Sequence, residues 1–150
     1  MNNKMTKICI NNKPYPVPVE MRPLWRIGLV VLTVKRMSTL KKSLDLNKLN
    51  VVLWMLIRNH NWEEFNIFLR NNHENIPFIT SDQANYIAIE LAFNKGLIKF
   101  NEEKIITTQD GDKFFHQIIE NSIFNNELNF INENASHFTN VMIDKIVGKK

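Results

Sequence analysis

The stretch NKGLIKFNEEKIITTQDGDKFF, Asn94–Phe115, decides the fold that we expect for this chain. Gly96 is the residue type that most often follows the end of a helix, because glycine tolerates the left-handed backbone found there. Two short runs of strand-forming residues come next, Leu97–Phe100 and Lys104–Thr107, with NEE between them. Thr108 then offers a hydroxyl that can cap a new helix. The stretch therefore predicts a helix, a β-hairpin and another helix in immediate succession.

The residues around this stretch predict further helices. Their apolar residues recur at helical spacing, and Pro23, Asp45 or Asn47, and Ser81 are suitable first or capping residues. The expected helices cover residues 23–38, 46–59, 62–72, 81–95, the segment after Thr108, and roughly Ala135–Val147. A helix followed directly by a hairpin, in an otherwise helical chain, is typical of a winged helix. We therefore predict a mainly α fold with a small β-hairpin wing, a winged-helix-like domain over residues 23–150 with extra N- and C-terminal helices.

Residues 1–22 are expected to form a separate arm. Prolines at positions 14, 16, 18 and 23 fix the backbone and remove N–H donors, which favours an extended conformation. Two interpretations stay open: a disordered tail, or an arm that lies on a neighbouring protein. In the second case Tyr15, Val17 and Val19 would make the contacts.

Composition indicates an ordinary globular protein. The chain has 150 residues, 44% of them apolar and 23% charged, which fits one domain with a real core. Cys9 is the only cysteine, so neither an internal disulfide nor a cysteine-based zinc site is expected, and a reducing cytoplasm is the natural location. The most apolar run, Ile27–Val34, is far shorter than the roughly 20 residues that span a bilayer. No signal peptide is expected at the start of the sequence.

Sequence motifs give no indication of an enzyme. Phosphate-binding glycine loops, a GxSxG turn and HExxH are absent, and the four histidines are too far apart to form a helical metal pair. Asp110–Asp112 is too short a series for a calcium loop, and helix capping explains both carboxylates. We expect no catalytic residue, no metal and no cofactor.

The charges of the predicted wing disfavour the binding mode for which winged helices are best known. In that mode the helix before the hairpin enters the DNA major groove and needs basic residues nearby. Here that helix carries Asp82 and Glu90 with Lys95 at its far end, and the hairpin tip is acidic. Gln83 and Asn85 are the side chains that would meet bases.

Basic residues gather in the N-terminal half. Residues 1–75 hold 12 Lys/Arg against 5 Asp/Glu, whereas residues 76–150 hold 7 against 10. One interpretation is a solvated helix end, where cations are favoured, and the other is a sequence-independent contact with DNA phosphates. The residues concerned are Lys35, Arg36, Lys41, Lys42 and Lys48.

The first predicted helix is apolar on nearly all faces from Leu24 to Val34, which suggests that a second chain covers part of it. Trp25 lies between Arg22 and Arg26, and tryptophan and arginine are enriched at binding hot spots. We therefore expect partner-binding residues at Arg22, Trp25 and Arg26, with Tyr15 from the arm; the alternative for Trp25 is a core residue.

The chain also resembles a known family. The segments RPLWRIGLVVLTVKR (Arg22–Arg36), LNKLNVVLWMLI (Leu46–Ile57), and the two halves of the wing region are similar to the middle component of bacterial ABC-three-component, Lamassu-type anti-phage defence systems. The most specific match is Arg-Pro-x-Trp-(Lys/Arg)-Ile at the start of an apolar helix, Arg22–Ile27 here. The resemblance runs from about Met21 to Lys145.

This resemblance implies a non-catalytic accessory subunit that sits beside an SMC/Rad50-like ATPase and an effector, often a nuclease. The subunit would bind the ATPase head or the adjoining coiled coil and help to restrain or position the effector. The alternative from a different class is a winged-helix transcriptional regulator that binds DNA. A third option is weak DNA contact made only inside the complex, through the basic residues between Lys35 and Lys48.

Overall fold

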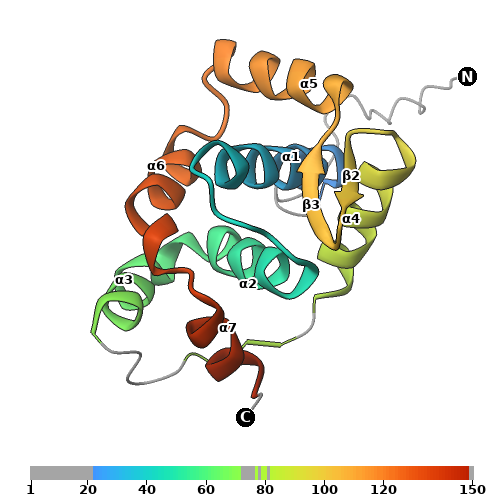
Figure 1. The fold of residues 1–150 in the computed structure, drawn as a ribbon. Helices are drawn as coiled ribbons and strands as arrows, with labels where there is room; N and C mark the ends of the chain where they lie inside the picture. Colours follow the sequence, from blue (N-terminus) through green and yellow to red (C-terminus); the bar gives the residue numbers. More distant parts are fainter. Residues whose placement is uncertain (1–21, 72–76, 78, 81, 149–150) are drawn as a thin grey trace, which may run out of the picture.

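A computed structural model shows a mainly helical protein with one small antiparallel hairpin (Figure 1), and it describes residues 22–71, 77, 79–80 and 82–148. This confirms the predicted fold class. The elements are α1 (Pro23–Thr39), α2 (Leu46–Ile57), α3 (Trp62–Arg70), α4 (Gln83–Asn94), β2 (Ile98–Asn101), β3 (Lys104–Thr107), α5 (Gln109–Glu120), α6 (Asn125–Asn134) and α7 (Asn140–Val147), with short 3-10 helices η3 (Asn59–Asn61) and η4 (Ala135–His137).

Helix α1 is the centre of the molecule. It packs against α4, α5, α2, α6 and β3, which surround it in Figure 1. Every residue from Arg26 to Val34 is buried within this one chain. Burial of each large apolar side chain there contributes about 1.5–3 kcal/mol to folding. The expectation that a second chain covers this run is therefore wrong, because α2, α4, α5 and α6 of the same chain cover it.

The hairpin forms as predicted, with a tighter turn. Ile98 pairs with Thr107 and Asn101 with Lys104, so only Glu102 and Glu103 remain in the turn. Both have positive φ angles, 53° and 69°, which match a two-residue turn of the type that follows the twist of the strands. The asparagine that was expected in the tip belongs to β2 instead.

Gly96 ends α4 as its sequence position predicts. Its φ is +73°, and its N–H donates to the Phe93 carbonyl oxygen. The N–H of Leu97 donates to the Ala92 carbonyl oxygen at 2.9 Å. These two bonds satisfy carbonyl groups at the end of the helix and turn the chain into β2.

Side-chain caps fix the starts of α4 and α5. The hydroxyl of Thr108 accepts from the N–H of Gly111 at 3.1 Å, as expected from the sequence. At α4 the carboxylate of Asp82 accepts from the N–H of Ala84 at 3.0 Å. The cap predicted at Ser81 lies outside the described residues.

The arrangement around the hairpin is winged-helix-like. Helix α4 leads directly into β2 and β3, and the α1–α2 connection lies along β3, where the N–H of Ile105 donates to the Leu44 carbonyl oxygen at 2.8 Å. Helix α3 is an addition between α2 and α4 that packs on α2 and α6. Helices α5 to α7 follow the hairpin and extend the core.

The C-terminal part differs from the prediction. The sequence predicted one helix from Ala135 to Val147, but the backbone breaks after η4 and Thr139 caps α7 through the N–H of Met142. Helix α6 was not predicted, because its seven polar residues, five of them asparagine, hide a short apolar pattern. That pattern buries Phe130 and Ile131 in the core.

Candidate functional site

The outward stripe of α4 is the surface that would face a DNA groove. Its exposed side chains at helical spacing are Gln83, Tyr86, Ile87 and Glu90. Two of them are large and apolar and one is acidic. A DNA-reading helix presents hydrogen-bonding groups to bases and cations to phosphates, so the chemistry of this stripe suits a protein surface better than a DNA groove.

Asn85 does not face outward, although it was expected as a possible base contact. It is 2% exposed, and its Oδ1 accepts from Arg26 Nη1 at 2.6 Å. The same nitrogen of Arg26 lies 3.4 Å from Asp82 Oδ2. The three side chains tie α1 to the start of α4.

Arg26 is therefore placed differently from a surface anchor. It is a buried arginine whose guanidinium is bonded by groups of its own chain. Buried charges need such partners, because leaving water without them is costly. The structure gives Arg26 a role in holding the core together and does not present it to a partner.

The wing carries an exposed aromatic side chain. Phe100 of β2 is 55% exposed, and its ring stacks on Phe93 of α4 with a centroid distance of 4.9 Å. Lys99 and Lys104 are exposed on the two strands, and the tip holds the two glutamates. The wing thus mixes apolar, basic and acidic groups.

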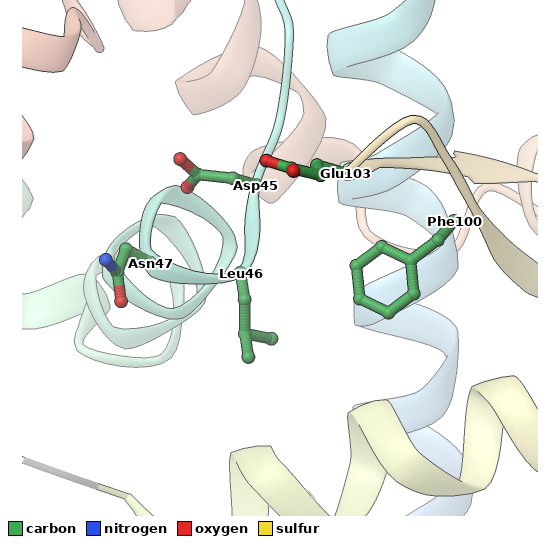
Figure 2. A pocket seen from close by; sticks show the side chains of 5 residues that line it. All are labelled: Asp45, Leu46, Asn47, Phe100 and Glu103. Atoms are coloured by element: carbon green, nitrogen blue, oxygen red, sulfur yellow. The ribbon is translucent and has the colours of Figure 1, made fainter.

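An open hollow of about 450 Å³ lies between the wing and the start of α2. Figure 2 shows Asp45 and Glu103 on one side of it and Leu46 and Phe100 on the other, with Asn47 further along α2. Among the residues that the structure describes, two carboxylates and no cation line this hollow. Phosphates would be repelled here, whereas an apolar or basic segment of a protein would be accommodated.

A second hollow, which we name the α1-end hollow, is almost entirely apolar. It has a volume of about 310 Å³ and lies between the first turns of α1 and helix α5. Leu24 is 68% exposed beside it and Ile123 is 44% exposed. The hollow is lined by Arg22, Leu24, Trp25, Gly28, Phe114, Ile118, Ile123 and Phe124.

Arg22 and Trp25, two of the four residues expected to bind a partner, therefore both line this apolar hollow. Trp25 is half-buried, and its ring meets the ring of Phe124 edge-on at 5.3 Å. Leu24 and Phe114 also line the adjoining hollow along α5, so the apolar surface continues past them. Tyr15 lies outside the described residues.

The five basic residues do not form one cluster. Lys35 Nζ pairs with Asp112 Oδ1 at 3.0 Å, and Arg36 Nε donates to Asn132 Oδ1 at 2.6 Å. Lys35 is thus bonded to α5 and Arg36 to α6. The other three, Lys41, Lys42 and Lys48, line a separate hollow of about 250 Å³ where the α1–α2 connection meets the start of α7.

Lys48 is the least expected of these side chains. Both interpretations of this residue from the sequence, a solvated cation or a phosphate contact, imply an accessible side chain, but it is only 6% exposed. Burial lowers the pKa of its ammonium group; Asp45 opposes this effect and Lys42 adds to it. A cation in the first turn of α2 is also disfavoured by the helix dipole.

Sequence reasoning missed the side chains that complete these surfaces. Leu24 and Ile123 are ordinary apolar residues in the sequence, and only the packing of α5 over α1 leaves them exposed. One signal was present for Leu24: it follows Pro23 in the first turn of a helix, where the chain enters the domain and neighbours are few.

Among the described residues, no group of three or more His, Cys, Asp or Glu side chains is close enough to hold a metal ion. Within the same residues no helix combines the length and apolar character needed to cross a bilayer. Comparisons with family models, with curated proteins and with solved structures find no match to this chain.

Proposed function

We propose that this protein is a non-catalytic, cytoplasmic accessory subunit that binds an SMC/Rad50-like ATPase in a Lamassu-type anti-phage defence complex. The class of partner comes from the resemblance at Arg22–Arg36. Its site on the ATPase would be the head or the adjoining coiled coil, and its task would be to help restrain or position the effector nuclease.

The observation that carries the proposal is the α1-end hollow. Contiguous apolar surface that folding leaves open marks a protein contact more often than scattered single residues do. Here Leu24 and Ile123 stand exposed beside a half-buried tryptophan, in the segment that carries the resemblance. Binding hot spots have this composition: an aromatic anchor in an apolar pocket with an arginine nearby.

The shape and chemistry of the hollow suit a helical partner segment. An amphipathic helix places apolar side chains three and four residues apart, and a groove between two helices receives them. Leu24 and Phe114 would contact that apolar stripe, and Arg22 at the edge would favour an acidic residue beside it. A coiled-coil surface of an ATPase supplies such helices.

The experiment is co-expression of this chain with the SMC/Rad50-like ATPase encoded beside it, followed by purification through a tag on the ATPase. The proposal expects both proteins to elute together in a defined complex. A monodisperse chain that separates from the ATPase would contradict it. Addition of the effector then tests the second part, since nuclease activity should be lower with this subunit than without it.

The alternative is a transcriptional regulator that binds DNA through the wing, and Lys99 and Lys104 are the residues that favour it. It expects tight, sequence-selective binding to the chain's own promoter with a steep salt dependence. Fluorescence anisotropy with a promoter duplex separates the two functions. Weakening by Lys99→Gln and Lys104→Gln would support the regulator, and a flat response to the duplex would exclude it.

A further inference from the structure

The hollow around Lys48, which we name the lysine pocket, joins two connections that are far apart in the sequence. The α1–α2 connection brings Lys41 and Lys42, and α2 brings Lys48. Ser136 comes from η4 and Asn140 from the start of α7. Every charged side chain that lines the pocket is a lysine. Cations that share a hollow repel one another, so an anion bound among them would stabilise this arrangement.

Lys48 shows that the pocket is more than a patch of surface lysines. Its side chain is buried, and in the described part of the chain it has no carboxylate within ion-pair distance. Burial lowers the pKa of its ammonium group, and the carboxylate of Asp45 offsets only part of this effect. The side chain lines the pocket, so an anion that partners it would lie there.

The backbone adds to the positive character of the pocket. Helix α7 begins at Asn140, so the N–H groups of its first turn and the positive end of its dipole lie at the pocket wall. On the opposite wall, Lys41 has a φ of 61°, a left-handed conformation in which glycine is preferred. The chain thus keeps a lysine at a position where its backbone is strained.

We propose that Lys41, Lys42 and Lys48, together with the start of α7, bind a phosphate group. A tetrahedral dianion matches several lysine point charges, helix N–H groups and the hydroxyl of Ser136 at once. The phosphate belongs either to a nucleic-acid backbone or to a free nucleotide or inorganic phosphate. This site is on a different surface from the α1-end hollow, so it stands or falls independently of the proposed function.

The test is an NMR titration of the full chain with inorganic phosphate, against sodium chloride at matched ionic strength. Phosphate should shift the backbone amides of Asn140 and Val141, and Lys48→Met should weaken that binding about tenfold or more. The double variant Lys41→Gln/Lys42→Gln, at one exposed and one half-buried position, should do the same and keeps the test valid if Lys48→Met fails to fold. The wing pair Lys99→Gln/Lys104→Gln is the matched control and should bind as the unaltered chain does.

A parallel titration with a DNA duplex of arbitrary sequence identifies the source of the phosphate. If the backbone of DNA is the ligand, the duplex shifts the same amides, and the pocket variants reduce the salt slope of binding by about 0.9 for each phosphate that they no longer neutralise. If only inorganic phosphate acts, the ligand is a free phosphate or nucleotide. Absence of both responses in the unaltered chain, or persistence of the shifts in both pocket variants, would overturn the proposal.

Discussion

At the residue scale, the most informative side chain is Arg26, because its sequence setting suggested a surface and its structural setting is the core. Its partners lie 56 and 59 positions further along the chain. Local patterns report on neighbours within a few residues, so a contact of this range was beyond them. Trp25 is half-buried against Phe124, so its role as a partner-binding residue stays a prediction.

Replacing Arg26 by methionine should destabilise the protein by about 1–3 kcal/mol, because the buried Oδ1 of Asn85 would be left without its donor. Urea denaturation measures this free energy of unfolding. The control is Arg36→Met, which removes an exposed hydrogen bond to Asn132 and should change stability by about 0.5 kcal/mol or less. Equal destabilisation of both variants would contradict the internal role of Arg26.

A second residue-scale prediction concerns pH. Burial by itself would raise the pKa of Asp112, but the hydrogen bond from Thr107 Oγ1 and the ammonium of Lys35 outweigh it and hold the pKa below its ordinary value. A carboxyl whose pKa is depressed by folding stabilises the protein above the unfolded-state pKa, about 3.9. That contribution disappears as the pH falls below this value and through the folded pKa.

Asp112→Asn should therefore reduce stability at pH 7, and the difference from the unaltered chain should shrink as the pH falls below about 4. The matched control is Asp110→Asn, a carboxylate in the same first turn of α5 without the contacts to Thr107 and Lys35. Both substitutions remove a favourable interaction with the helix dipole. Urea denaturation at pH 7 and pH 3 gives the free energy of unfolding of each variant. A difference in this free energy between the two variants that does not change with pH would refute the role of the Lys35–Asp112 ion pair.

At the element scale, the sequence was a good guide wherever a cap or a glycine marks a boundary. Thr108, Gly96 and Asp45 act as expected. The second strand of the hairpin has the predicted bounds, and the first is shifted by one residue. The sequence was a poor guide to α6. This helix is rich in asparagine, which has a weak helical preference, and it depends on the burial of Phe130 and Ile131. Tertiary packing, which no local pattern reports, decides such an element.

Gly111 gives an element-scale prediction about how α5 meets the hairpin. A Cβ atom there would lie 2.0 Å from the Leu97 carbonyl oxygen, which accepts the N–H of Thr108. Gly111→Ala should therefore destabilise the protein by about 1–3 kcal/mol, although alanine usually favours a helix. Thermal or urea unfolding measures the change.

The control for Gly111 is Gln109→Ala, an exposed change in the same turn that should cost about 0.5 kcal/mol or less. A Gly111→Ala variant as stable as this control would show that α5 does not approach the start of β2 so closely.

At the scale of the whole molecule, the proposed partner now rests on the α1-end hollow, whereas the sequence suggested a partner because helix α1 is apolar on nearly all faces. The apolar helix α1 was expected to need a second chain, but α4, α5, α2 and α6 bury it. Sequence alone could not show this, because α6 was not predicted and the packing of α5 over α1 was not foreseeable. Of the apolar run from Leu24 to Val34, only Leu24 and Trp25 in the first turn are not buried, and this turn coincides with the resemblance and with the α1-end hollow.

The central claim is that the α1-end hollow binds the ATPase, and a pair of matched variants tests it. Leu24 and Val141 are exposed to similar extents, 68% and 63%, and each is the second residue of its helix. An aspartate is favoured near a helix start in both places, so both variants should fold. Only Leu24 lies at the hollow.

The decisive measurement is the dissociation constant of the purified chain for the SMC/Rad50-like ATPase, compared among the unaltered chain, Leu24→Asp and Val141→Asp. We predict that Leu24→Asp weakens binding about 30-fold or more, as expected for a charge placed in the centre of an apolar contact, and that Val141→Asp binds as the unaltered chain does. Equal affinity of all three proteins, or no binding by any of them, would contradict the account.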